Sequence, residues 1–185
     1  MVAYTVPGMK TGDAERVTVL LQDRLNSLSD LALTLKHVHW NVTGKNFIAV
    51  HTMLDPQVDA VRAMTDETAE RIAALGGSPV GTPGALVEQR DWDDYSIGRA
   101  DAIAHLGALD VVYSGIIEAH RAAIDTTDEL DLVTQDILIG QARQLEQFQW
   151  FVRAHLESAD GTLSTVGAST EGAAAKRAQK SNKKR

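Results

Sequence analysis

Five residues with metal-binding side chains are spaced so that a single helix cannot bring them to one ion. They are two histidines and three carboxylates: His39, His51, Asp55, Asp66 and Glu70. His51 and Asp55 are four residues apart, as are Asp66 and Glu70, so each pair shares a helix face. Asp55 and Asp66 are separated by about 16 Å along a helix axis. Ligands of one ion lie within about 2 to 2.6 Å of it, so a site that uses all five residues needs a second copy of the chain.

These side chains favour redox iron over several other metals. Imidazole with carboxylate suits iron, zinc or manganese better than copper(I) or calcium. An open coordination sphere of two histidines and a carboxylate leaves room for water or peroxide. Common di-iron bundles use Glu-x-x-His pairs, and no glutamate in this sequence has a histidine three residues later. Spacing alone also allows a non-functional interpretation, because acidic residues on amphipathic helices are usually solvated and histidines near helix ends often only pack.

Four long helical stretches must position these residues. Apolar residues recur with a period close to 3.6 in four ranges: 13–40, 47–75, 96–126 and 130–158. Gly44 and Gly76-Gly77 predict the ends of the first two helices. The connection over residues 76–95 is rich in glycine, proline and threonine and predicts one or two helical turns. Four helices joined with one long crossover favour an all-α four-helix bundle.

The composition fits one soluble domain. The 185 residues are 44% hydrophobic and include no cysteine, which excludes disulfides and thiolate metal sites and is typical of a reducing cytoplasm. The first eight residues lack the charged start and apolar run of a signal peptide. No stretch approaches the roughly 20 apolar residues of a membrane helix, so we expect no membrane partner.

Charge is distributed unevenly along the chain. Residues 171–185 carry six cations and one anion, which gives them a net charge of +5. The other residues, the body of the protein, carry 12 cations and 24 anions and have a net charge of −12. From Gly161 onward there is little to bury, which predicts disorder. The predicted organisation is an N-terminal segment 1–12, a helical bundle 13–158 and a flexible basic tail 159–185.

Several runs in this sequence resemble the Dps family, the DNA-binding proteins from starved cells. The resemblance covers roughly residues 13–158, and it rests on Lys36-His37-Val38-His39-Trp40-Asn41, Gly44, Asn46-Phe47-Ile48-Ala49-Val50-His51, Met53-Leu54-Asp55, Asp66, Ala69-Glu70-Arg71, Leu75-Gly76, Gly81-Thr82, Asp136, Phe148 and Trp150-Phe151. All five positions of the family's metal-ligand pattern hold the expected residue type.

The resemblance implies a ferritin-like four-helix bundle with a short helix in the crossover, assembled as a homo-dodecameric hollow shell. It implies an iron-binding ferroxidase site at a two-fold interface, with His39, His51 and Asp55 from one subunit and Asp66 and Glu70 from its partner. The implied reaction is oxidation of Fe(II) to Fe(III) by hydrogen peroxide, followed by mineral storage inside the shell.

The family also places an acidic pore, through which iron enters, near the turn into the last helix. Asp131 and Asp136 match those positions best, and Asp128 lies in the same cluster. Around a three-fold axis each carboxylate would form a ring of three that concentrates cations. Helix capping is an alternative explanation for Asp131.

The basic tail predicts non-specific binding to double-stranded DNA. Its six cations, on a flexible segment, can reach phosphates without base contacts, and twelve tails on one shell would add avidity. The cations are Lys176, Arg177, Lys180, Lys183, Lys184 and Arg185. We therefore expect a cytoplasmic, nucleoid-associated protein. Two alternatives stay open: an iron shell with no DNA binding, and a structural nucleoid-compacting protein whose metal site is idle.

Overall fold

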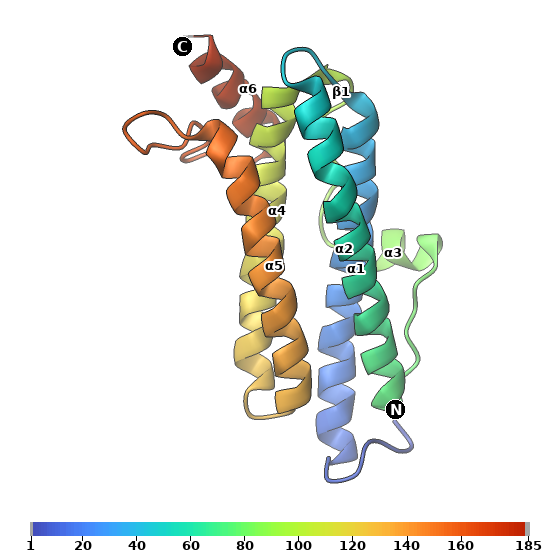
Figure 1. Ribbon diagram of the computed structural model, residues 1–185. Helices are drawn as coiled ribbons and strands as arrows, with labels where there is room; N and C mark the ends of the chain where they lie inside the picture. The colour runs from blue at the N-terminus through green and yellow to red at the C-terminus, as the bar shows by residue number, and fades with distance from the viewer. Residues whose placement is uncertain (1, 184–185) are drawn as a thin grey trace. The chain divides into compact units, whose positions relative to one another are not determined.

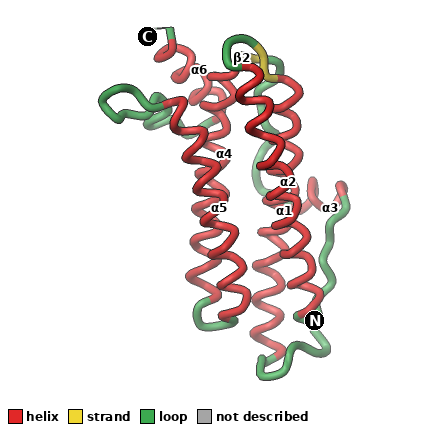
Figure 2. Tube along the Cα trace, in the orientation of Figure 1, coloured by secondary structure: helices red, strands yellow, loops and turns green. Residues whose placement is uncertain are grey.

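The computed structural model describes residues 2–183 of the chain, and helix dominates it (Figures 1 and 2). The elements in chain order are α1 (Thr11–Asn41), β1 (Val42–Thr43), α2 (Phe47–Ala74), α3 (Pro83–Gln89), β2 (Ala100–Asp101), α4 (Ala102–Thr127), α5 (Leu132–Leu156) and α6 (Glu171–Asn182). The prediction of an all-α fold with a short helix in the long connection is confirmed.

Local signals explain where the helices begin and end. Helix α2 ends before Gly76, which has a φ of 85°, a left-handed conformation that glycine adopts without strain. Helix α4 begins at Ala102 rather than near residue 96, because the Asp101 carboxylate caps it by accepting the Ala104 N–H at 2.9 Å. Aspartate is a favoured N-cap, so the cap marks this boundary better than the apolar period does.

The structure divides into two compact units, and each of α1, α2, α4 and α5 runs through both. Unit 1 comprises residues 2–33, 59–92 and 118–142, and unit 2 comprises residues 34–58, 93–117 and 143–183. Each unit therefore contains a segment of all four long helices.

The core of unit 1 contains residues from all three of its segments. Its buried cluster contains Val2, Ala14, Val17, Leu21, Leu25, Ile72, Leu75, Ala123 and Leu138. The N-terminal segment joins this cluster through Val2, whose N–H donates to Glu15 Oε1 at 2.8 Å. A Cβ at Gly76 would lie 2.0 Å from the Tyr4 carbonyl oxygen. Gly76 thus allows the N-terminal segment to pass close to the end of α2.

In unit 2, two short strands tie the end of α1 to the start of α4. They pair in parallel, with Val42 opposite Ala100 and Thr43 opposite Asp101. Buried apolar side chains of this unit come from all four long helices and include Leu35, Val38, Val50, Leu54, Leu106, Leu109, Leu145, Phe148 and Val152. The strand pair and this core fix the segments that carry His39 and His51.

The prediction of a disordered tail over residues 159–185 is wrong for residues 171–182. Helix α6 occupies Glu171–Asn182, and Ala174, Ala175 and Ala178 are buried. Thr170 caps the helix by accepting the Ala173 N–H. Alanine is the best helix former and buries no polar group, so a segment with few large apolar residues can still fold against a close neighbour.

Among the described residues, one helix is long and apolar enough to cross a membrane. It is α4, with a mean hydropathy of 1.3 over its most apolar window, and 56% of that window is buried inside the structure. A helix that is apolar all round is expected in a protein core as well, so composition alone does not assign α4 to a membrane.

Candidate functional site

His39 and His51 form a stacked pair in unit 2. Their ring centroids are 3.6 Å apart, with an interplanar angle of 24°. His39, near the end of α1, is 7% exposed, and His51 lies in the first turns of α2. The turn at residues 42–46 reverses the chain, and Gly44 there has a φ of 80°. The reversal brings together two histidines that are twelve residues apart.

Reciprocal hydrogen bonds set the orientation of both imidazole rings. His39 Nδ1 lies 2.9 Å from the His51 carbonyl oxygen, and His51 Nδ1 lies 2.9 Å from the His39 carbonyl oxygen. Since a carbonyl can only accept, each Nδ1 carries a proton and donates it. In a neutral ring, the lone pair then belongs to Nε2. This is the arrangement that orients histidine ligands in metal sites.

Asp55 is held beside the pair by two contacts. Its Oδ1 lies 3.3 Å from His39 Nδ1 and 3.0 Å from Lys36 Nζ. The hydrogen bond from Lys36 is the main cause that lowers the pKa of Asp55, so the carboxyl is ionised throughout the neutral range. Its side chain is half exposed. The structure therefore brings together three of the five predicted ligands, all in unit 2.

Asp66 and Glu70 lie further along α2, in unit 1, and both are exposed. Within residues 2–183 of one chain, no three histidine, aspartate or glutamate side chains are grouped so that they could hold a metal ion. The assignment of Asp66 and Glu70 to a partner's site stays a prediction.

The predicted pore residues have different surroundings. Asp131 is only 11% exposed and forms a 2.6 Å ion pair with Arg71, whereas Asp128 and Asp136 are exposed. Burial acts to raise the pKa of Asp131, but the hydrogen bonds from Arg71 and Thr134 outweigh it, so the pKa is lowered. Asp131 thus caps α5 and neutralises Arg71, which favours its capping role. The pore itself stays a prediction.

We expect Asp131→Asn to lower the free energy of unfolding at pH 7 by about 1–3 kcal/mol, because a buried charged hydrogen bond to Arg71 is lost. The pKa of Asp131 is lower in the folded state, so its stabilisation is complete above the unfolded value of about 3.9 and disappears as pH falls through the folded value. Urea denaturation at several pH values should therefore show a constant difference from wild type near neutrality and a shrinking one below about pH 4.

The exposed Asp136→Asn variant is the matched control for this measurement, and its stability should stay within about 0.5 kcal/mol of wild type. Equal destabilisation by the two substitutions would contradict the capping role of Asp131.

Helix α6 presents cations on its outer face. Lys176, Arg177, Lys180 and Lys183 are exposed, and the buried alanines lie on the opposite side. Lys176, Lys180 and Lys183 follow the i, i+4, i+7 spacing of one helix face, while the Arg177 guanidinium donates to the Val166 carbonyl. Lys184 and Arg185, which belong to the same prediction, lie outside the described residues.

Three contacts dock α6 in unit 2. A Cβ at Gly107 of α4 would lie 2.8 Å from the Ala174 carbonyl oxygen and 2.9 Å from Ala178 Cβ, so only glycine allows this approach. Glu171 Oε2 accepts the Ser96 N–H at 2.7 Å and its hydroxyl at 2.8 Å. Gln179 donates to Asp101 Oδ2 at 3.0 Å. The cations of α6 therefore sit on an ordered helix rather than on a loose end.

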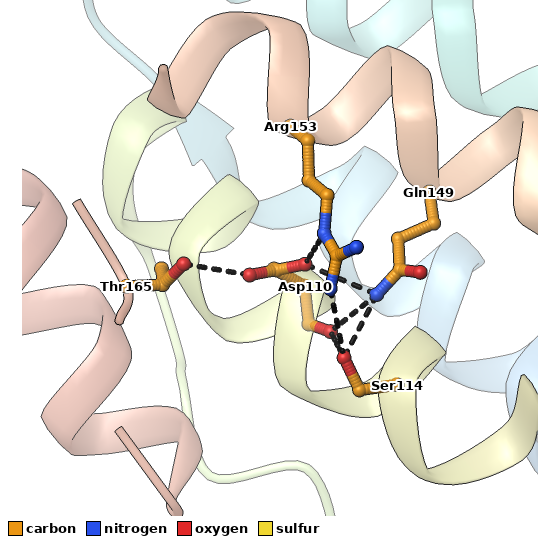
Figure 3. Close-up of polar contacts among 5 residues, drawn as sticks. All are labelled: Asp110, Ser114, Gln149, Arg153 and Thr165. Carbon is orange, nitrogen blue, oxygen red and sulfur yellow. Dashed lines mark hydrogen bonds and ion pairs between the residues drawn. The ribbon is translucent and has the colours of Figure 1, made fainter. Parts of the chain in front are cut away.

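A polar network around a buried carboxylate fixes the loop that leads to α6 (Figure 3). Asp110 on α4 is 5% exposed. Its Oδ1 accepts from Arg153 Nε at 2.7 Å and from Gln149 at 3.1 Å, and its Oδ2 accepts the Thr165 hydroxyl at 2.6 Å. A buried carboxylate is stable only when it is paired and hydrogen-bonded, and here Thr165 completes the pairing.

Sequence patterns missed Lys36 beside Asp55 and the docking of α6. For the helix, a signal existed: Thr170 before an alanine-rich run is a cap followed by strong helix formers. No pattern signalled Gly107, whose partner lies far along the chain.

Comparison with known proteins agrees with this fold. The sequence matches the family described as a ferritin-like domain over residues 19–161. A DNA protection during starvation protein of Mycolicibacterium smegmatis is 57% identical over 180 residues, covering 97% of this chain and 98% of the relative.

Two solved structures are similar throughout. Mycobacterium smegmatis Dps matches with a TM-score of 0.90 at 58% identity, covering 92% of this chain and 97% of that one. DpsA14 from Streptomyces coelicolor matches with a TM-score of 0.87 at 67% identity, covering 88% and 96%. The ferritin-like fold expected from the resemblance is thereby confirmed. With this fold and identities above one half over nearly its whole length, the chain belongs to the Dps family of ferritin-like proteins.

Proposed function

We propose that the protein is a ferroxidase that oxidises Fe(II) to Fe(III) with hydrogen peroxide, stores the product in a hollow shell of twelve copies and protects DNA by binding it. The observation that carries the proposal is the stacked His39–His51 pair beside Asp55. Both Nδ1 atoms are engaged by backbone carbonyls, so both Nε2 lone pairs remain for a metal. The DNA protection named for the M. smegmatis relative supports the protective role.

Each ligand type has a chemical task in this proposal. Neutral imidazoles hold the iron substrate without cancelling its charge, whereas carboxylates supply the negative charge that stabilises Fe(III) relative to Fe(II). Two Fe(II) ions supply the two electrons that reduce one peroxide to water. Iron and peroxide are consumed together, which suppresses hydroxyl-radical formation and protects nearby DNA.

Asp66 and Glu70 would reach the site from a partner subunit. The helix rise between Asp55 and Asp66, about 16 Å, prevents one α2 from supplying both carboxylates to a single ion. Exposure of Asp66 and Glu70 in the isolated chain is consistent with a role at an interface. Asp128 and Asp136 are the exposed acids that would guide Fe(II) through a pore, while Asp131 shapes the helix end beside them.

The basic face of α6 would bind duplex phosphates without sequence preference. A body with a net charge of −12 repels DNA, so the cations of residues 171–185 must supply the attraction. Such a protein would act in the cytoplasm, on the nucleoid. The second candidate is an iron-storing shell that does not bind DNA. If the cations of residues 171–185 did not bind phosphates, the negatively charged body would repel DNA.

A direct assay of the full chain tests the ferroxidase. Anaerobic protein receives Fe(II) and then hydrogen peroxide, while ferric absorbance, residual peroxide and native mass are followed. We expect two Fe(II) ions oxidised per peroxide, and a native mass of twelve 20.0 kDa chains that rises as iron is stored. Iron oxidation no faster than in buffer would refute the ferroxidase and leave the structural nucleoid protein as the better description.

A further inference from the structure

Three aromatic side chains form a row in unit 2, on the His37 side of α1. Tyr95 lies between His105 of α4 and His37 of α1. The Tyr95 hydroxyl is 3.0 Å from His105 Nδ1. The Tyr95 and His105 ring centroids are 6.1 Å apart and nearly parallel, and His37 meets Tyr95 edge-on at 5.8 Å. His105 is completely buried, and neither Tyr95 nor His105 belongs to the proposed metal ligands.

The protonation states in this row are well defined. Burial is the main cause that lowers the pKa of His105, while the nearby backbone of Asn41 and Gly98 acts in the opposite direction. The ring is therefore neutral at neutral pH. Burial, with a smaller effect from the Glu171 charge, raises the pKa of Tyr95. Tyr95 thus holds its proton and donates it to the lone pair of His105 Nδ1.

We propose that the Tyr95–His105 pair is a one-electron donor site, at which Tyr95 is oxidised to a neutral tyrosyl radical while its proton moves to His105 Nδ1. This inference rests on the proposed ferroxidase for its physiological oxidant, which is peroxide reacting at a site that holds one Fe(II). Peroxide takes up two electrons, together with two hydronium protons from the solvent, to give two water molecules. One electron comes from Fe(II), which becomes Fe(III), and the other comes from Tyr95, whose O–H bond breaks as the His105 N–H bond forms.

The fold places this donor at a suitable separation from the proposed iron ligands. His37 and His39 are two residues apart on α1, so they lie on roughly opposite sides of that helix. Tyr95 packs on the His37 side, and the stacked His39–His51 pair lies on the other. The separation is therefore about one helix diameter, about 10 Å. A single electron can cross this distance without contact between donor and acceptor.

The other buried tyrosine provides a matched comparison within the same unit. Tyr113 is completely buried, and its hydroxyl donates to Gln57 Oε1 at 2.7 Å. An amide oxygen accepts a hydrogen bond but is too weak a base to take the proton. Oxidation of Tyr113 would leave a buried phenol cation, which is strongly unfavourable. The basic acceptor therefore distinguishes Tyr95 from Tyr113.

The test is freeze-quench electron paramagnetic resonance on the full chain with Fe(II) below one ion per site, mixed with hydrogen peroxide. The chain has three tyrosines, so wild type, Tyr4→Phe, Tyr95→Phe and Tyr113→Phe cover every candidate. We expect a tyrosyl signal, narrowed by deuterated tyrosine, in all samples except Tyr95→Phe. His105→Gln keeps a hydrogen-bond acceptor but no base, and should lower the radical yield at least about tenfold.

Ferric absorbance in the same samples separates the two proposals. A tyrosyl signal that survives in Tyr95→Phe, or iron oxidation with no tyrosyl signal in wild type, would overturn the inference while leaving the ferroxidase intact. If iron is not oxidised at all, photogenerated ruthenium(III) tris-bipyridine replaces it as the one-electron oxidant. With this oxidant, loss of the tyrosyl signal in Tyr95→Phe and a lower radical yield in His105→Gln support the proposed Tyr95–His105 donor site. An unchanged tyrosyl signal in both variants refutes it.

Discussion

A shell assembled from equal amounts of two complementary variants should oxidise iron at about a quarter of the wild-type rate, because half of its two-fold interfaces are mixed and one of their two sites is intact. One variant carries His39→Ala with His51→Ala, and the other carries Asp66→Asn with Glu70→Gln. Each variant alone should lose at least about 100-fold in initial rate, since direct ligands matter more than their supporting groups, which already cost 10–100-fold. Stopped-flow ferric absorbance after peroxide addition measures both effects.

The mixed shell distinguishes a site shared between chains from a site within one chain. If one chain supplied all five ligands, no mixture of the two variants would contain an intact site, and the rate would stay at the level of the single variants. His155→Ala is the matched control, because His155 is not among the proposed ligands, and it should oxidise iron at the wild-type rate. Native mass must be that of the full assembly in every sample, so that lost activity reports the site and not failed assembly.

Neutralising the basic face of α6 should weaken binding to duplex DNA at least about 100-fold at low salt, because four phosphate contacts per subunit disappear. The variant carries Lys176→Gln, Arg177→Gln, Lys180→Gln and Lys183→Gln. Each lost contact should also flatten the dependence of log affinity on log salt by about 0.9. Gel shifts and fluorescence anisotropy over a salt series, with unrelated duplex sequences, measure both quantities.

Two further variants separate charge from helix docking. Gly107→Val displaces α6 but keeps its cations, and non-specific phosphate binding needs no fixed geometry, so its affinity should stay within about threefold of wild type. Gly115→Val on the same helix, where a Cβ meets open space, controls for the substitution itself. If the four-cation variant shifts DNA as wild type does, α6 is not the DNA-binding element, and an iron shell without DNA binding becomes the better description.

The sequence by itself determined the features that depend on neighbours along the chain. Apolar spacing located the four long helices, and Gly44 and Gly76 marked two of their ends, because helix periodicity and left-handed glycines act over a few residues. The placement of His51 and Asp55 on one helix face likewise followed from their spacing and from helix geometry alone. The charge difference between body and C-terminal segment is a property of composition.

Tertiary structure decided which side chains meet. The proton positions of His39 and His51 depend on carbonyls across the turn, and the basic partner of Tyr95 comes from a different helix. The ion-pair partner of Asp131 is Arg71, sixty residues earlier in the chain. The sequence of α6 predicts disorder because its alanines alone offer little surface to bury, and the helix folds because Gly107 lets its backbone approach α4 closely. Such partners are set by packing between distant segments, which no local spacing records.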